Sequence, residues 1–326
     1  MRQPAVQRDH GPRIFLMASV LSFLIGATPF AFATSSVFYQ LDYPGAVATS
    51  AQGLNDSQQI VGTYHLSDGN DHGFFYTNGV FGTVDVPGAV GTSLHGINNA
   101  GMMVGSYSDS STLHGFLRTN NSYQTIDVIG ASTTVANGVN LAGNQVVGTY
   151  TNSTGEHGFL LNGSVLTTIN VPGATSTSAQ GINSSGDIVG SFRDASSPFS
   201  HGFMETKQGK FTTIDVPGAT DTIIYDINKS GQIVGQFGNA TGLHGFLEDR
   251  KGHFITIDYP GSTGGTFILG NNNRGEFVGG FFSGDFHGFL DPPADGATIV
   301  NPEPSTVLLL GSGLAVLIAW RRRYVQ

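Results

Sequence analysis

Six histidines recur at a nearly constant spacing, and they are the residues of this sequence best suited to chemistry. Each opens a His-Gly-Phe tripeptide, and successive tripeptides lie 42 to 44 residues apart: His72, His114, His157, His201, His244 and His287. Imidazoles that converge on one axis could bind a metal ion. Equivalent repeats place their histidines at equivalent positions, however, and nothing in the sequence directs that position toward an axis. We therefore expect structural imidazoles and no metal site.

Each repeat also carries one acidic or amide side chain that could pair with its histidine. These residues stand shortly before a turn in every repeat: Asp42, Asp85, Asp127, Asn170, Asp215 and Asp258. Buried polar groups need hydrogen-bond partners, and each such bond contributes about 0.5–1.5 kcal/mol. We predict that histidine bonds to this Asp or Asn, or to backbone, and so joins strands. A solvent-exposed imidazole is the remaining alternative.

Calcium is the one cofactor that the sequence leaves open, because Asp68, Asn70 and Asp71 crowd one loop and Ca²⁺ prefers hard oxygen ligands. The spacing lacks the full EF-hand pattern. The sequence has no G-x-S-x-G elbow, H-E-x-x-H helix or P-loop, and no carboxylate pair suited to glycoside hydrolysis stands out. We expect no catalytic residue and no enzymatic activity. A unique site would lie where one repeat departs from the others, at Ile129, Asn144, Asp226 or Asn271.

Short β-strands must position these residues. In the fourth repeat, Phe211–Val216 alternates apolar and polar residues with period two, as a half-buried strand does. Pro217-Gly218 suits the centre of a type II turn, where Gly accepts a positive φ. Four such strands in ~43 residues is the size of one propeller blade. The sequence therefore predicts an all-β fold, a six-bladed β-propeller over residues 34–295. A β-solenoid and two fused trefoils are the alternatives.

The repeat region begins and ends partway through a repeat, so that its first and last strands belong to one incomplete repeat. It starts on the expected strand Phe38–Asp42 and ends on Phe286–Leu290, and these two strands form a hairpin in the complete repeats. We predict that they pair, which would close the ring and remove its free edges.

The repeats resemble the HAF-type extracellular repeat family, whose His-x-Phe motif reads His-Gly-Phe in every copy here. The resemblance spans nearly the whole chain between its two ends. It implies an extracytoplasmic, propeller-like domain and brings no catalytic residues with it.

Residues 1–33 have the features of a secretory signal peptide that signal peptidase would remove. A basic leader precedes an apolar run over residues 14–27, and Ala31-Phe32-Ala33 supplies the small-x-small cleavage pattern, with Ala31 and Ala33 as the small residues. An uncleaved anchor helix is the alternative, although the run is shorter than the ~20 residues that span a bilayer.

The other end contains a second export signal. Residues 296–304 form a linker that ends in Pro302, Glu303 and Pro304, and residues 305–326 form a single hydrophobic, transmembrane helix with an Arg cluster at Arg321, Arg322 and Arg323. The Arg cluster should stay cytoplasmic, so the chain before it is translocated. This tail resembles the PEP-CTERM sorting signal of Gram-negative bacteria. The resemblance implies recognition by an exosortase-type membrane protease, removal of the helix, and delivery to the envelope, surface or matrix. A plain tail anchor is the alternative.

Composition narrows the function classes further. The net charge of −9, from 14 Lys and Arg against 23 Asp and Glu, argues against a nucleic-acid partner. The lack of Cys in the sequence excludes disulfides, Cys-ligated metals and thiol nucleophiles. We expect an exported structural or interaction module of the cell envelope or extracellular matrix, in contact with membrane only through its last helix. A polysaccharide-binding protein is the first alternative, and a glycan-active hydrolase or lyase is the second.

Overall fold

The chain between its two ends folds into β-strands. The computed structural model describes residues 38–292, and in this range it has 24 strands and no helix. The all-β prediction is therefore confirmed. Within the same range, no helix is long and apolar enough to cross a membrane. The expected signal peptide with Ala31 and Ala33, the linker at 296–304 and the helix at 305–326 lie outside the described residues.

The strands pair in antiparallel groups of four. The first two groups comprise β2 (Ala48–Leu54), β3 (Ile60–His65), β4 (Asp71–Thr77) and β5 (Val80–Thr83), then β6 (Gly91–Ile97), β7 (Met103–Ser108), β8 (Leu113–Thr119) and β9 (Ser122–Ile126). The next two comprise β10 (Thr133–Val139), β11 (Gln145–Asn152), β12 (Gly155–Asn162) and β13 (Val165–Ile169), then β14 (Ala174–Ile182), β15 (Ile188–Asp194), β16 (His201–Glu205) and β17 (Phe211–Ile214). A further group comprises β18 (Asp221–Ile227), β19 (Ile233–Asn239), β20 (Gly242–Glu248) and β21 (Phe254–Ile257).

The last group is built from both ends of the described chain. It contains β22 (Thr266–Asn271), β23 (Phe277–Ser283), β24 (Asp285–Asp291) and the two-residue strand β1 (Tyr39–Gln40). β1 runs antiparallel to β24, with Tyr39 opposite Leu290 and Gln40 opposite Phe289. The predicted pairing of the terminal strands is confirmed. β1 is shorter than expected, although the Leu41 N–H still donates to the Gly288 carbonyl at 2.8 Å.

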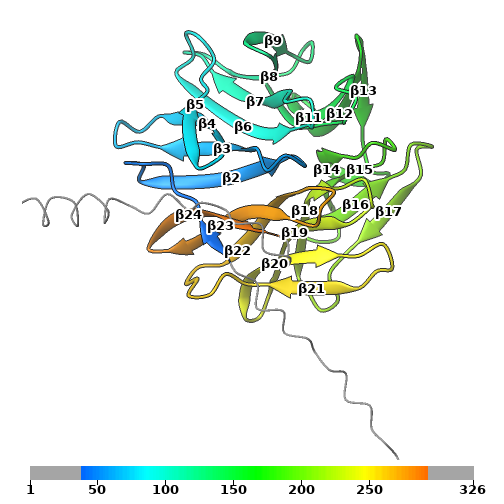
Figure 1. Cartoon of the computed structure of the whole chain (residues 1–326). Coiled ribbons are helices and arrows are strands. Elements are labelled where there is room, and N and C mark those ends of the chain that lie inside the picture. Colours follow the sequence, from blue (N-terminus) through cyan, green and yellow to red (C-terminus); the bar gives the residue numbers. More distant parts are fainter. Residues whose placement is uncertain (1–37, 293–326) are drawn as a thin grey trace, which may run out of the picture. The chain divides into compact units, whose positions relative to one another are not determined.

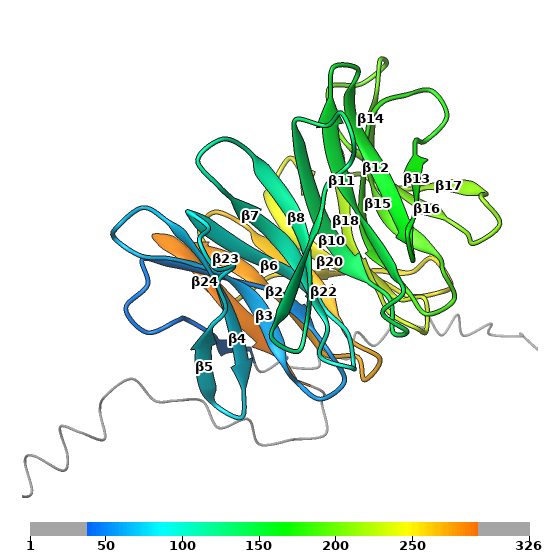
Figure 2. The ribbon, with the colours of Figure 1, turned by 90° about the horizontal axis from the view of Figure 1, so that it is seen from above.

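The groups are arranged around their first strands. β2, β6, β10, β14, β18 and β22 each contact the next in this order, and β22 contacts β2. In Figure 1 the fourth strands β9, β13, β17 and β21 lie at the periphery, and Figure 2 shows the same groups from above. A single parallel bridge between Leu113 and Thr133 joins two groups, so the strands form five sheets, one of them eight-stranded. The arrangement is propeller-like.

The core lies between neighbouring groups and is filled by the Phe of each His-Gly-Phe tripeptide. All six of these side chains are fully buried: Phe74, Phe116, Phe159, Phe203, Phe246 and Phe289. Glycine in the adjacent strand makes room for the ring. A Cβ on Gly148 would lie 2.6 Å from the Phe159 ring and 2.0 Å from the Val135 carbonyl oxygen. This close approach explains the Gly of the repeated Val-Gly pair.

Every first strand contains the same irregularity. The register shifts near the end of each of β2, β6, β10, β14, β18 and β22, as it does at a β-bulge, and β14 has a second shift at its start, between Ala174 and Ser176. A bulge leaves one residue out of the ladder and redirects its side chain. The residues left out at the shift that all six strands share are Gln52, His95, Asn137, Gln180, Tyr225 and Leu269. The bulge therefore presents one side chain per group at the centre.

The predicted turn in the fourth repeat also forms. Gly218 has a φ of +82°, and the Ala219 N–H donates to the Val216 carbonyl at 3.0 Å. This is the geometry of a type II turn with Pro at its second position and Gly at its third.

Candidate functional site

The structure brings each repeated histidine to its acidic or amide partner. The Nδ1 atom lies 2.8 to 3.0 Å from a side-chain oxygen in all six pairs: His72–Asp85, His114–Asp127, His157–Asn170, His201–Asp215, His244–Asp258 and His287–Asp42. The last pair joins β24 to the chain just after β1, so the same bond also ties the two ends of the fold together. The histidines thus connect strands within each group.

An aromatic side chain packs on every one of these imidazoles, and sequence reasoning missed this contact. Its ring centroid lies 5.0 to 5.4 Å from the imidazole centroid in the pairs Tyr64–His72, Tyr107–His114, Tyr150–His157, Phe192–His201, Phe237–His244 and Phe281–His287. The two residues of each pair are direct cross-strand partners. A recurring aromatic residue was visible in the sequence, but its position opposite histidine depends on the strand register.

Two of the histidines face a second carboxylate. His72 Nε2 lies 3.7 Å from Asp68 Oδ2, and His114 Nε2 lies 3.3 Å from Asp109 Oδ2. The hydrogen bond to Asp85 raises the pKa of His72, and that to Asp127 raises the pKa of His114. In residues 38–292, no group of three or more His, Cys, Asp or Glu is placed to hold a metal ion.

The loop that suggested calcium uses its oxygen atoms locally. Asp68 Oδ1 accepts the Asn70 N–H at 3.0 Å, and Asp71 Oδ1 lies 2.7 Å from His65 Nδ1. The structure therefore places Asp68, Asn70 and Asp71 in a side-chain-capped turn and a surface ion pair. Calcium at this loop stays a prediction.

A ring of six asparagines follows the first strands: Asn55, Asn98, Asn140, Asn183, Asn228 and Asn272. Four of them link neighbouring groups, whereas the Nδ2 groups of Asn140 and Asn183 donate to side chains of their own group. In Asn55, for example, Oδ1 accepts the Ser57 and Gln59 N–H groups at 3.0 and 3.1 Å, while Nδ2 donates to the Asn98 carbonyl at 3.1 Å. The same bond to the next group runs from Asn98 to Asn140, from Asn228 to Asn272, and from Asn272 back to Asn55. Sequence reasoning gives these asparagines a turn-capping role but misses the link between groups.

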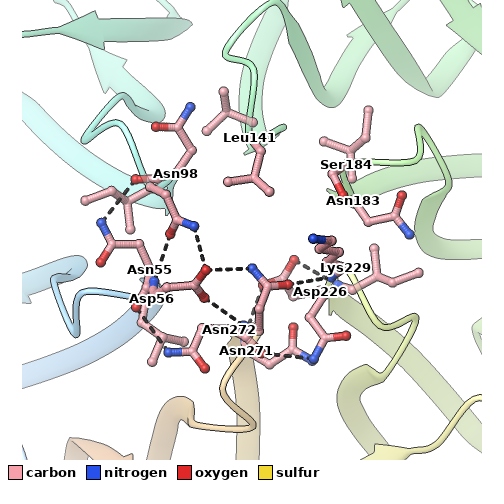
Figure 3. A pocket seen from close by; sticks show the side chains of 18 residues that line it. Asn55, Asp56, Asn98, Leu141, Asn183, Ser184, Asp226, Lys229, Asn271 and Asn272 are labelled. Carbon is pink, nitrogen blue, oxygen red and sulfur yellow. Dashed lines mark hydrogen bonds between the residues drawn. The ribbon is translucent and has the colours of Figure 1, made fainter.

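Two small cavities lie at the centre. One, of about 80 Å³, is lined by the asparagine ring and its neighbours (Figure 3). The other, of about 50 Å³, is lined by the six side chains that the bulges present, together with residues beside them. Asp226 lines both cavities. We refer to the two together as the central channel.

Two departures from the repeat meet in the central channel. Asp226 stands where the other groups have Gly, and Asn271 stands where they have Leu, Ile or Val. Asp226 Oδ1 accepts the Ile227 N–H at 2.8 Å, and its Oδ2 accepts the Asn271 N–H at 3.1 Å. Burial raises the pKa of Asp226 to about 7. The Asn271 Nδ2 group donates to the Gln232 carbonyl at 3.0 Å, but its buried Oδ1 has no hydrogen-bond donor among the described residues.

The other two departures lie apart from this pair. Asn144 Oδ1 accepts the Asn140 Nδ2 group at 3.2 Å. Ile129 is fully exposed and borders a surface groove of about 490 Å³ between β9 and the β12–β13 hairpin. Only Asp226 and Asn271 therefore form a joint feature.

Comparison with known proteins yields one sequence match. The PEP-CTERM protein-sorting motif matches residues 302–323, which contain Pro302, Glu303, Pro304, Arg321, Arg322 and Arg323. The predicted sorting motif is confirmed, and it indicates an exported protein that an exosortase sorts and that is processed at its C-terminus. No curated protein matches the sequence.

Several solved structures are similar in fold at low identity. Virginiamycin B lyase from Staphylococcus aureus is 11% identical, with a TM-score of 0.44 and coverage of 79% of this chain and 99% of that one. TolB from Acinetobacter baumannii is 11% identical, with a TM-score of 0.49 and coverage of 73% and 64%. A gluconolactonase from Xanthomonas campestris is 11% identical, with a TM-score of 0.46 and coverage of 76% and 89%. At these values the similarities carry no information about activity.

Proposed function

We propose that this protein is an exported structural or interaction module: a six-bladed β-propeller of HAF-type repeats, made with a signal peptide and delivered by an exosortase to the envelope, surface or extracellular matrix of a Gram-negative bacterium. The observation that carries the proposal is the sorting motif at residues 302–323, because it is an address for export. Signal peptidase and the exosortase are its partners during export. It works without catalysis and without nucleic acid.

The strand arrangement supports the six-bladed ring. Each group of four strands has the size and order of one blade, and the first strands contact one another in cyclic order. The pairing of β1 with β24 completes the last group from both ends of the chain. A ring closed in this way has no long unpaired edge in its interior, which protects the strands from pairing with other chains.

The use of the repeated side chains supports a structural role over a catalytic one. The six histidines are the most reactive side chains of the repeat, and each has its Nδ1 committed to an Asp or Asn oxygen. Each is also covered on one face by an aromatic ring. Histidines held in this way stabilise the fold, because they satisfy buried and half-buried polar groups across strands.

A binding screen with a simultaneous assay for turnover tests the proposal. The purified chain is immobilised and exposed to cell-surface extract and to a glycan panel, and the bound and unbound fractions are analysed for chemical change. We expect saturable retention of an envelope or matrix component that is released unchanged. Cleavage of a glycan would replace the proposal with the hydrolase or lyase alternative. No retention of any component would contradict an interaction module.

The sorting step has its own test. Replacing Pro302 and Glu303 with Ala should leave the uncut chain in the membrane fraction, because the recognised motif is lost, whereas the parent chain should reach the surface or matrix fraction. Equal processing of both chains, measured by immunoblot of the fractions, would contradict exosortase sorting.

A specific observation favours polysaccharide binding as the second candidate. Phe267, Phe282 and Phe286 form an aromatic cluster on the group of β22–β24, with centroids 4.8 to 5.9 Å apart. Phe282 is 38% exposed. Gly280 makes room for the cluster, because a Cβ there would lie 2.2 Å from the Phe286 ring. Aromatic faces of this kind offer an apolar body for contact with a partner.

This candidate predicts that Phe282→Ala weakens retention of a polysaccharide at least tenfold. Phe199→Ala is the matched control, since Phe199 is also exposed but lies outside the cluster. Equal retention by both variants would remove the polysaccharide interpretation of this surface.

A further inference from the structure

The pair of Asp226 and Asn271 needs a partner that the described residues do not supply. Asp226 is half-buried in the wall of the central channel and accepts two backbone N–H groups. None of the ion pairs within residues 38–292 includes it. Burying an ionised carboxylate is costly unless a cation or several donors compensate it. Lys229 lines the same cavity (Figure 3) but forms no ion pair with Asp226 within residues 38–292, so a further positive charge in the channel would provide that compensation.

Asn271 supplies an independent indication at the same place. Its side chain is only 7% exposed and lines the same cavity as Asp226 (Figure 3). Its Nδ2 group is bonded to the Gln232 carbonyl, which fixes the orientation of the amide. The buried Oδ1 then has no donor among residues 38–292. Buried acceptors are nearly always paired in native proteins, so this oxygen indicates a missing ligand.

The size of the channel limits what that ligand can be. Its two cavities measure about 80 and 50 Å³. A water molecule requires roughly 10–15 Å³ on the same measure, whereas pockets for organic ligands measure about 300–1,000 Å³. The channel can therefore hold an ion with a few waters and is too small for a sugar ring.

The donor atoms select the kind of ion. Asp56 also lines the larger cavity, but its carboxylate already accepts hydrogen bonds from Asn99 and Asn273. The remaining side-chain ligands are the Asp226 carboxylate and the Asn271 amide oxygen, and no group of three or more His, Cys, Asp or Glu among the described residues is placed to hold a metal ion. Hard cations such as Ca²⁺ prefer carboxylate, amide and water oxygens, whereas transition metals prefer imidazole and thiolate. With one carboxylate, binding should be weak, in the range of about 10⁻⁴–10⁻³ M seen for extracellular calcium modules.

We propose that the central channel binds one hard, oxygen-liganded cation, with Ca²⁺ as its representative, between the Asp226 carboxylate and Asn271 Oδ1. Water completes the coordination. The two departures from the repeat occur together because they are the two side-chain ligands of one site. This site is separate from the loop of Asp68, Asn70 and Asp71, and it does not depend on the proposed envelope function.

Terbium luminescence on the full chain tests this proposal directly. Tb³⁺ substitutes for Ca²⁺ at oxygen sites, and its emission is excited through a nearby tyrosine. Tyr225 lines the channel beside Asp226. We expect saturable, tyrosine-sensitised emission that Ca²⁺ displaces with a midpoint of about 10⁻⁴–10⁻³ M.

The repeats themselves provide the variants. Asp226→Gly installs the residue of the other five groups, and Asn271→Ile installs the residue found in three of them, so both changes suit the local fold. Each should weaken the displaceable signal at least tenfold. Asp68→Asn is the control and should leave it unchanged.

Three results would overturn the proposal. The first is the absence of saturable emission up to about 10 mM of either ion, well above the affinity range of extracellular modules. The second is an unchanged signal in both Asp226→Gly and Asn271→Ile. The third is loss of the signal in Asp68→Asn, which would assign the ion to the loop. Thermal unfolding without the ion shows whether each variant is folded, and either variant alone is sufficient for the test.

Discussion

The histidine pairs and the central channel follow opposite rules, although the same repeat builds both. At the histidines, six groups repeat one geometry, with Nδ1 to oxygen distances of 2.8 to 3.0 Å. In the channel, six equivalent positions carry five different residue types: Gln52, His95, Asn137, Gln180, Tyr225 and Leu269. A position whose contacts lie within its own group is held constant. Of the positions that line the channel, the asparagines of the ring are constant, whereas the positions that the bulges present differ.

The glycines beside the channel explain how this freedom is possible. A Cβ on Gly53 would lie 2.9 Å from the His95 carbonyl oxygen, and one on Gly270 would lie 2.6 Å from the Gln52 carbonyl oxygen. Neighbouring first strands therefore approach through backbone, and the side chains of the bulges are not needed to join them. The side chains at the bulge positions can therefore differ from group to group without disturbing the contacts between the first strands.

The strongest test of the constant region is Gly148→Ala. The new Cβ would meet the Val135 carbonyl oxygen and the Phe159 ring, both in the buried interior. Overpacking of this kind costs about 1–3 kcal/mol and sometimes more, and we expect the upper end or loss of folding in urea unfolding. Gly82→Ala is the control, because its Cβ would meet only the Phe75 carbonyl oxygen at 3.8 Å. Equal stability of the two variants would contradict the close packing described for Gly148.

A histidine pair is tested by His157→Ala. This change removes the bonds to Asn170 and Thr154, at 2.9 and 2.8 Å, and the contact with the Tyr150 ring. Two bonds of about 0.5–1.5 kcal/mol each predict a loss of about 1–3 kcal/mol in the free energy of unfolding, with no effect on partner binding. His253→Ala should cost less, since the His253 side chain is 73% exposed. A larger loss for His253→Ala would show that the repeated pairs are not the stabilising ones.

The pH dependence of stability tests the charged pairs. The pKa values of His72 and His114 are raised by their bonds to Asp85 and Asp127. Their stabilising contribution is therefore complete below the ordinary pKa of about 6.5 and is lost as pH rises through the higher folded-state values. The thermal midpoint should fall as pH rises above about 6.5 for this reason.

The matched variant for this measurement carries Asp85→Asn and Asp127→Asn, which copy the neutral Asn170 of the third pair. Both exchanges keep an acceptor for the imidazole but remove its charge, so the variant should lose part of the pH dependence. Asp68 and Asp109 also face the two imidazoles. An identical pH profile in parent and variant would assign the dependence to other groups, such as Asp226, whose pKa burial raises to about 7.

The smallest effect is expected in the channel, for Leu269→Gln. Gln already occupies the equivalent positions 52 and 180, and Leu269 is half-buried, so the change should stay within about 0.5 kcal/mol. Its neighbour Ile268 is fully buried, and Ile268→Gln should cost several times more because it buries an unpaired amide. Similar losses for both variants would contradict the distinction between channel and core.

Much of the fold could be predicted because each repeat contains short-range patterns that specify its strands and turns. Alternating residues place Phe211–Ile214 in a strand, Pro217-Gly218 makes a turn, and the ends that fall partway through a repeat require β1 to pair with β24. Each inference depends on neighbours along the chain or on comparison between copies. The candidate site was harder to predict from the sequence. Asp226 and Asn271 were recognisable as departures, but their contact spans 45 positions and belongs to two different groups.

The sequence by itself determined the strand content, the repeat period, the pairing of the terminal strands and the sorting motif, because each is encoded in a local pattern or in the comparison between repeats. Only the tertiary structure decided that an aromatic ring covers each imidazole, that four of the asparagines bond to the next group, and that Asp226 meets Asn271, whose buried Oδ1 has no donor within residues 38–292. These contacts depend on strand register, on bulges and on the closing of the groups around one axis. These contacts form only when the backbones of different groups pack together, and the spacing of residues along the chain does not specify them.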